Sequence, residues 1–411
     1  PSSDTGSQVI VGGEVRGQMS AADYFKMKRQ LIPDILAAFN SLSEDVDIVV
    51  IEGAGSPAEI NLKADDIVNM GLAKLVDAPV LLAGDIDRGG VFAQLYGTVA
   101  LLEQEERARI AGLIINKFRG DVEILRPGLA MLEEKTGLPV LGVVPYLHVE
   151  IEDEDSLSER LNANRAVKPL DAAVIRLPHI SNFTDFMPLE QHELLGVRYV
   201  QRARELGRPD LVILPGTKNT MEDLLWLRQN GLEAAALKLA HAGTPILGVC
   251  GGYQMLGQTL DDPQGTESGR PMALSGLGLL PTRTVFDAQK RRMQVRAAAQ
   301  GELFGGARLT GYEIHNGRTE VGGAPFCVLE DGTPEGCVNR NVFGTYLHGL
   351  FDSGELTGAL VRMLCARKGI SPTQTKLMSM ADYRQQQFDL LADGVRQALD
   401  MGAVYRAINT A

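Results

Sequence analysis

The sequence has 411 residues, of which 45% are hydrophobic and 45 are glycines, and its formal net charge is −12. A chain of this length predicts two or three domains, and its apolar content excludes a disordered protein. The acidic balance excludes a protein that binds nucleic acid through basic stripes, and the lack of a long apolar run excludes a helix that spans a membrane.

The first 150 residues alternate short apolar runs with amphipathic stretches, and we expect them to form one domain, 1–150. Strands that are apolar on both faces are typical of a parallel sheet covered by helices on both sides. The alternation therefore predicts a doubly wound α/β layer with a mostly parallel sheet. Strands are expected at 46–51, 79–83, 110–115 and 140–144, and helices at about 20–40, 62–76, 91–107 and 121–136.

A run of acidic residues from Glu150 to Asp155 and a polar stretch follow the first domain. Blocks of like charge usually form solvated connectors, so we expect a linker at 151–168. The α/β rhythm then resumes and predicts a second domain at 169–358 and a helical tail at 359–411. Strands of this domain are expected at 172–177, 210–214, 245–249, 279–285 and 344–346, and an amphipathic helix of the tail at about 381–408.

Polar residues follow three expected strands of the first domain. Glu52 ends the first of them, where nucleotide-binding α/β folds place a carboxylate that holds Mg²⁺; a solvated carboxylate is the alternative. The next strand opens a helix whose N-terminus can receive phosphate, and a further strand ends in a loop that either frames a nucleotide or is an ordinary connection. The candidates for nucleotide and phosphate binding at these two strand ends are Asp85, Asp87, Arg88, Asn116 and Lys117.

Cys250 follows the strand expected at 245–249, and Gly251 and Gly252 lead from it into a helix. This is the order of a nucleophile elbow, in which a tight turn presents a reactive side chain at the carboxyl end of the sheet. The glycines permit the turn, and the N-terminus of the following helix favours a thiolate. A buried structural cysteine beside a glycine turn is the alternative.

A histidine and a second glycine turn supply what a cysteine nucleophile needs. His348 ends a strand and can take the thiol proton and return it to a leaving group. The Pro-Gly turn at Gly216 follows another strand, and its N–H group, with that of Gly251, can hold the oxyanion of a tetrahedral intermediate. Because the cysteine turn and the Pro-Gly turn occur in the same domain, a catalytic role of the histidine is favoured over a structural one.

These motifs resemble the glutamine amidotransferase domain of the cobyric acid and cobyrinic acid synthases. The resemblance is carried by residues 248–257, by the Leu-Pro-Gly-Thr-Lys loop and by residues 344–349. It implies a class I glutamine amidotransferase-like α/β domain in which the cysteine and the histidine are catalytic. Class I amidotransferases commonly carry a glutamate two residues after the histidine, whereas this chain has Leu350, so the group that orients His348 is left unassigned.

Two further segments of the second domain match that family. Glu313 and His315 lie in the first of them, either as catalytic or substrate-contacting residues or as polar residues of a structural strand. The second segment, 180–187, ends in Met187 where the family usually has Asp. If that carboxylate has a role at the domain interface, it is absent here.

The motifs of the first domain resemble the ATP-dependent synthetase domain of cobyric acid synthases, which is related to dethiobiotin synthetase. Residues 52–62, 84–90 and 1–10 favour this branch over the cobyrinic acid a,c-diamide synthases. The family begins with a P-loop that ends in Gly-Lys-Ser/Thr; no such motif occurs in this sequence, and Pro1 aligns with a point after it. We therefore expect an N-terminally incomplete fold of the P-loop NTPase type that binds ATP weakly or not at all.

The resemblance implies a cytoplasmic ligase that uses glutamine and ATP to amidate carboxylates b, d, e and g of adenosylcobyrinic acid a,c-diamide. Its expected partners are glutamine, ATP with Mg²⁺ and a corrinoid, without a prosthetic group, nucleic acid or membrane; the oligomeric state stays open. A related amidotransferase, such as cobyrinic acid a,c-diamide synthase or the cell-wall amidotransferase subunit, is the first alternative. An ATP-incompetent glutaminase or binding module is the second.

Overall fold

The computed structural model divides into two compact units. The first comprises Pro1–Val149 with Gln387–Ala411, and the second comprises Glu150–Gln386. Most of the linker predicted at 151–168 lies outside the residues that the structure describes. The described residues are 6–151, 167–287, 291–301, 304–371 and 379–409.

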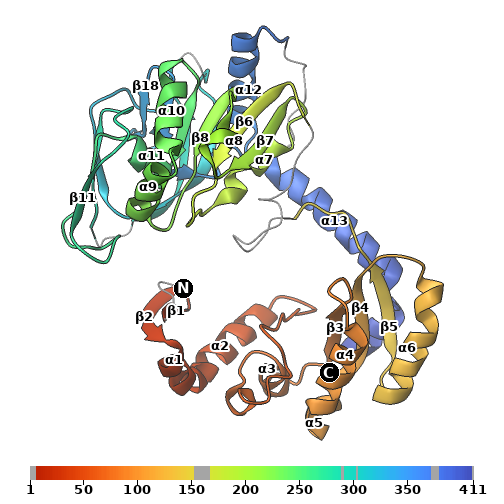
Figure 1. Cartoon of the computed structure of the whole chain (residues 1–411). Coiled ribbons are helices and arrows are strands. Elements are labelled where there is room, and N and C mark those ends of the chain that lie inside the picture. Colours follow the sequence, from red (N-terminus) through yellow and green to blue (C-terminus); the bar gives the residue numbers. More distant parts are fainter. Residues whose placement is uncertain (1–5, 152–166, 288–290, 302–303, 372–378, 410–411) are drawn as a thin grey trace. The chain divides into compact units, whose positions relative to one another are not determined.

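The sheet of the first unit consists of three parallel strands in the order β3 (Val80–Asp85), β4 (Ile110–Phe118) and β5 (Val140–Pro145) (Figure 1). Leu113 and Ile115 of the central strand are fully buried. This burial explains the continuous apolar runs, and the parallel strands predicted in this region are confirmed. The helices that pack on these strands are α4 (Val91–Leu101) and α6 (Val122–Thr136).

The strand predicted at 46–51 is wrong. These residues pair with no described strand, and most of their apolar side chains are exposed, with Val50 at 90% of its full accessibility. An apolar run becomes a buried strand only where a neighbouring strand satisfies its backbone groups. Among the described residues, the outer edge of β3 pairs with no strand, so this run finds no place in the sheet.

The remaining elements of the first unit are a hairpin, short helices and the C-terminal helices. The tail predicted at 359–411 is shared between the units, because α12 (Glu355–Lys368) belongs to the second and α14 (Met401–Asn409) to the first. Between them, α13 (Met380–Ala398) crosses the division. The other elements are β1 (Gly6–Val11), β2 (Glu14–Ser20), α1 (Ala21–Met27), η1 (Lys28–Leu31), α2 (Ile32–Ser43), η2 (Lys63–Asp65), α3 (Met70–Leu75) and α5 (Gln104–Arg107).

A six-stranded sheet, parallel except for one edge strand, forms the centre of the second unit (Figure 1). Thr345 pairs with Val249, so the segments that leave these two adjacent strands emerge side by side at one edge of the sheet. This register brings the residues after each strand into one site. The order is β18 (Cys337–Asn339), β19 (Val342–Thr345), β9 (Ile246–Val249), β8 (Leu211–Leu214), β6 (Leu170–Ile175) and β7 (Leu195–Val200).

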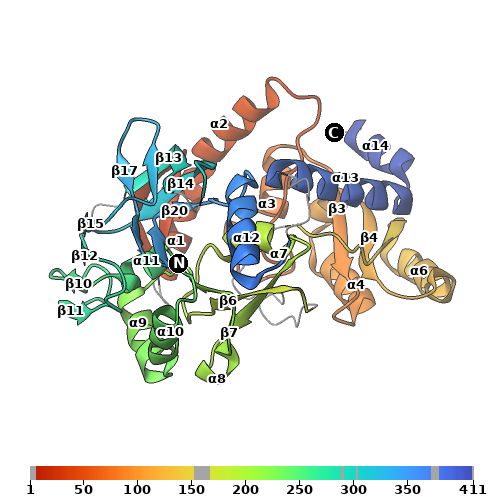
Figure 2. The same ribbon diagram turned by 90° about the horizontal axis from the view of Figure 1, so that it is seen from above.

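Short helices connect these strands, and two antiparallel-rich sheets complete the unit (Figure 2). The helices are η4 (Phe183–Phe186), α7 (Met187–Glu190), α8 (Ala203–Leu206), α9 (Thr220–Gln229), α10 (Leu232–His241) and α11 (Gly251–Leu256). The first added sheet has the order β11 (Met272–Ser275), β10 (Thr259–Asp262), β12 (Thr282–Val285) and β15 (Arg318–Val321). The second has the order β17 (Pro334–Glu335), β16 (Cys327–Leu329), β13 (Arg291–Ala299), β14 (Arg308–His315) and β20 (Leu347–His348).

Candidate active site

Cys250 occupies a sharp turn between β9 and α11, as the sequence predicts. Its φ of +52° lies in the left-handed region, which costs a non-glycine residue about 1–3 kcal/mol. Two backbone hydrogen bonds hold the turn, from Cys250 N to Thr345 O at 2.8 Å and from Gln254 N to Cys250 O at 3.0 Å. A Cβ atom on Gly252 would lie 2.0 Å from Leu214 O, so only glycine allows the helix to start this close to β8.

His348 lies beside Cys250 and is held by a carboxylate that the sequence did not identify. The histidine is 1% exposed, and its Nδ1 atom lies 2.7 Å from Asp185 Oδ2. The other oxygen of Asp185 accepts a hydrogen bond from Gly349 N at 2.9 Å. Asp185 therefore fixes both the ring and the backbone that follows it, and it fills the place that Leu350 leaves open. Met187, in the same segment, is buried.

The electrostatics of this trio favour a protonated histidine. Burial by itself lowers the pKa of His348, but hydrogen bonds to Asp185 and Cys250, and the attraction of their negative charges, raise it to about 10. His348 therefore carries its proton at neutral pH and has it available for a leaving group. The ring of Tyr312 stacks on the imidazole at a centroid distance of 5.4 Å, and its hydroxyl accepts a hydrogen bond from Asn182 Nδ2 at 2.6 Å.

The predicted oxyanion residues also lie at this site. A Cβ atom on Gly216 would lie 3.1 Å from His348 Cε1, so this backbone approaches the histidine closely. Gly251 directly follows Cys250, and a Cβ atom on it would lie 2.6 Å from Cγ2 of Thr217, the residue after Gly216. Among the described residues, the N–H groups of Gly216 and Gly251 donate to no acceptor. The loop is held by Ser181 N, which donates to Gly216 O at 2.9 Å. Two free donors beside a cysteine are what a tetrahedral oxyanion requires.

Gln254 forms hydrogen bonds to three segments around the site, and the sequence did not identify it. Its Oε1 atom accepts from Thr220 Oγ1 at 3.0 Å, and its Nε2 atom donates to Asn316 O at 3.1 Å and to Tyr346 Oη at 3.2 Å. Cys250 Sγ lies 3.6 Å from Ile314 O, near the end of β14 and two residues before Asn316. The position of this glutamine on the first turn after the nucleophile is the signal that could have identified it.

Glu313 and His315 do not join the catalytic trio. Tyr312 pairs with His348 across β14 and β20 and shares a face with it, and successive residues of a strand point to opposite faces. Glu313 and His315 therefore lie on the other face of this sheet, together with Arg291, which pairs with His315. The geometry favours neither residue as a general acid or base for Cys250.

Four of the predicted nucleotide-binding residues lie together at the carboxyl ends of β3 and β4. They are Asp85, Asp87, Asn116 and Lys117. Lys117 Nζ lies 2.8 Å from Asp85 Oδ2, and Ile86 N donates to Asn116 O at 3.1 Å. The hydrogen bond from Lys117 lowers the pKa of Asp85. Arg119, which was not predicted, pairs with Asp87 at 3.0 Å. The fifth predicted residue, Arg88, directly follows Asp87 in the loop after β3.

Glu52 is not brought to this cluster. It lies in the exposed irregular segment and makes no hydrogen bond or ion pair with any described residue. Across the part of the chain that the structure describes, no three His, Cys, Asp or Glu side chains converge as metal ligands. Mg²⁺ bound with a nucleotide takes only one or two protein carboxylates, and Asp85 and Asp87 fit that need.

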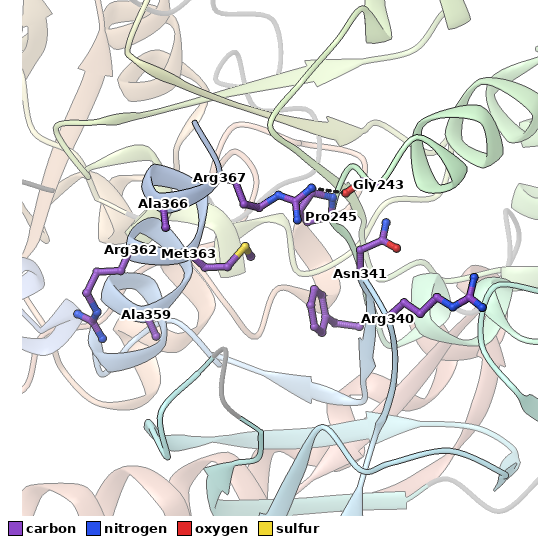
Figure 3. A pocket seen from close by; sticks show the side chains of 10 residues that line it. Gly243, Pro245, Arg340, Asn341, Ala359, Arg362, Met363, Ala366 and Arg367 are labelled. Carbon is purple, nitrogen blue, oxygen red and sulfur yellow. Dashed lines mark hydrogen bonds between the residues drawn. The ribbon is translucent and has the colours of Figure 1, made fainter. Parts of the chain in front are cut away.

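A cavity of about 690 Å³ lies at the amino-terminal end of β9 and β19, away from Cys250 (Figure 3). Its floor is apolar and includes Met363, while Arg340 and Arg362 extend from it on opposite sides. Its lining, as far as the described residues form it, contains no cysteine, histidine or carboxylate, so it lacks the chemistry of the predicted site.

No helix in the described ranges has the length and apolar character needed to cross a membrane.

Each of the two regions of the chain matches a known protein family. Residues 171–356 match the CobB/CobQ-like glutamine amidotransferase domain, and residues 19–152 match an AAA domain. The chain is 51% identical to the cobyric acid synthase of Ruminiclostridium cellulolyticum, over 99% of this chain and 82% of that protein. It is 52% identical to the cobyric acid synthase of Lachnoclostridium phytofermentans (99% and 83% covered) and 48% identical to that of Salmonella typhimurium (98% and 82% covered).

Proposed function

The chain belongs to the cobyric acid synthase family, and on this basis we propose that it amidates carboxylates b, d, e and g of adenosylcobyrinic acid a,c-diamide to give adenosylcobyric acid. Glutamine supplies the ammonia and ATP drives the reaction. The observation that supports this most is the contact between Cys250, His348 and Asp185 beside two free backbone donors.

In the second unit, the proposed reaction releases ammonia from glutamine. Cys250 sulfur attacks the side-chain amide carbon, and the N–H groups of Gly216 and Gly251 hold the resulting oxyanion. His348 gives its proton to the departing nitrogen, which leaves as ammonia, and a glutamyl thioester remains on Cys250. Water then attacks the thioester, His348 takes a proton from that water, and glutamate leaves.

In the first unit, a carboxylate oxygen of the corrinoid takes the γ-phosphoryl group of ATP, and ADP leaves. Ammonia then attacks the resulting acyl phosphate, and phosphate leaves as the amide forms. Lys117 and Arg88 would face the phosphate oxygens, and Asp85 and Asp87 would hold the accompanying Mg²⁺. When bound, that ion neutralises charge on the phosphates. Asn116 extends the same strand end and would line the nucleotide.

The test is amidation by the purified chain. With glutamine, ATP and adenosylcobyrinic acid a,c-diamide, mass spectrometry is expected to show successive replacement of carboxylates by amides, together with release of glutamate and phosphate. Turnover of cobyrinic acid but not of its a,c-diamide would instead support the related-synthetase alternative. Glutamate release without any ATP-dependent amidation would support the glutaminase-only alternative.

Lys117→Ala is expected to weaken binding of Mg-ATP by about ten- to a hundredfold, because a charge-assisted hydrogen bond to phosphate contributes about 1.5–3 kcal/mol. Isothermal titration calorimetry of the wild type gives the reference affinity, and absence of saturable binding of Mg-ATP by the wild type would support the ATP-incompetent alternative. The exposed Lys135 at the end of α6 provides the matched control, and Lys135→Ala should bind as the wild type does. Equal affinity of the two variants would contradict a phosphate contact by Lys117.

A further inference from the structure

A second cavity, of about 430 Å³, lies in the second unit on the face of β13 and β14 that points away from His348. Arg291, Glu313, His315 and Tyr346 line it. A volume of this size accommodates a small metabolite. None of its lining residues takes part in the proposed steps at Cys250, so the cavity has no role in the proposed release of ammonia.

Two buried polar atoms of this cavity lack hydrogen-bond partners in the described part of the chain. They are His315 Nδ1 and Glu313 Oε2. Arg291 Nε lies 2.6 Å from Glu313 Oε2 and balances its charge, but without the alignment of a hydrogen bond. A buried polar atom without a partner costs about 1–3 kcal/mol, so His315 Nδ1 points to a ligand that supplies the missing partner. Glu313 Oε2 is balanced in charge by Arg291 and can accept a further donor from the same ligand.

The inner wall accepts a hydrogen-bond donor rather than an anion. Glu313 is 2% exposed, and its carboxylate can only accept hydrogen bonds when it is ionised. The Nε2 atom of His315 lies 4.0 Å from Glu313 Oε2. Burial lowers the pKa of His315 to about 4, so this imidazole is neutral at pH 7 and can accept a hydrogen bond through one ring nitrogen. The ring is fixed by stacking on Tyr346 at a centroid distance of 3.6 Å.

The mouth of the cavity carries the opposite charge. Arg318 lines it with a side chain that is 80% exposed, and its Nε atom lies 3.1 Å from Asp287 Oδ2. Arg291 lies between the mouth and the buried glutamate, half exposed. A third carboxylate of the lining, Glu335, already accepts hydrogen bonds from Tyr346 N at 2.6 Å and from Thr345 Oγ1 at 2.7 Å. The acceptors of the inner wall therefore favour a positively charged donor, and the arginine at the mouth favours a negatively charged group on the same ligand.

We propose that this cavity binds a small zwitterionic amino acid, whose ammonium group donates to Glu313 and His315 while its carboxylate meets Arg318 at the mouth. The site is separate from the Cys250 site and independent of the proposed glutamine chemistry. It nevertheless adjoins that site, because Ile314 lies between Glu313 and His315 and its carbonyl contacts Cys250 Sγ at 3.6 Å.

The test uses zwitterions that lack the carboxamide of glutamine, so that the catalytic site does not select them. Glycine, 4-aminobutyrate and 6-aminohexanoate are titrated into the full chain by isothermal titration calorimetry, with butyrate and butylamine as single-charge controls. Saturable binding of at least one zwitterion, at one molecule per chain, is expected, and tighter binding than of either control. Glu313→Gln should weaken it by about tenfold or more, because the acceptor charge is lost.

Glu320→Gln is the matched control, since Glu320 is exposed on the neighbouring β15 and does not line the cavity. Because Glu313 is buried and its replacement could impair folding, Arg318→Gln at the exposed mouth provides a second variant, which should remove the preference for the zwitterion over butylamine. Absence of saturable binding by the wild type, or unchanged binding by both Glu313→Gln and Arg318→Gln, would overturn the proposal. Neither result bears on glutamate release.

Discussion

Cys250→Ala is expected to abolish glutamate release from glutamine, with a loss of rate on the order of 10⁴-fold or more. The thioester forms on this sulfur, and no other nucleophile lies at the elbow between β9 and α11 in the described residues. Alanine retains the small Cβ atom in the turn, so the fold should persist. Enzyme-coupled detection of glutamate, at saturating glutamine, measures the loss.

Cys365→Ala separates loss of the nucleophile from a general effect of removing a buried thiol. Cys365 is also buried, but it lies in α12, and burial raises its pKa, which disfavours a reactive thiolate. This variant should release glutamate at close to the wild-type rate. Supplying ammonium chloride should restore ATP-dependent amidation to Cys250→Ala, because the first unit needs only free ammonia. Retained glutamate release by Cys250→Ala would remove the nucleophile assignment.

The elbow was predictable because its determinants are local. A buried apolar strand, a cysteine and two glycines follow one another directly, and Gly252 is required by a close approach to Leu214 O that any side chain would block. The parallel strands β3, β4 and β5 were predictable for the same reason, because a strand that is buried on both faces consists of consecutive apolar residues.

Features that depend on distant partners were not predictable. Asp185 and His348 are 163 residues apart in the chain, and no spacing rule connects them. The side of the sheet on which Glu313 lies depends on the register of β14 with β20, which a single strand does not specify. Val50 shows the converse case, because a strongly apolar run remains outside the sheet when no neighbouring strand pairs with it.

Asp185→Asn is expected to slow glutamate release by on the order of 10²- to 10⁴-fold, because an amide in place of the carboxylate no longer stabilises the imidazolium or fixes its tautomer. The substitution should also change the pH dependence. Contacts with Asp185 and Cys250 raise the pKa of His348 to about 10 against the opposing effect of burial. In the wild type, the proton for the leaving nitrogen is therefore present at neutral pH and is lost as the pH rises through about 10.

Removing the charge of Asp185 leaves burial less opposed, so the pKa of His348 falls and the alkaline loss of kcat/KM moves to lower pH. The amide oxygen of Asn can still accept from Gly349 N, so the backbone after His348 should keep its position. Asp210→Asn is the matched control, because Asp210 pairs with Lys368 at the other end of the sheet and should leave the pH profile unchanged. A reduced rate with an unshifted alkaline limb would mean that Asp185 supports the fold around His348 without setting its protonation, whereas a shifted limb in Asp185→Asn alone assigns it the electrostatic role.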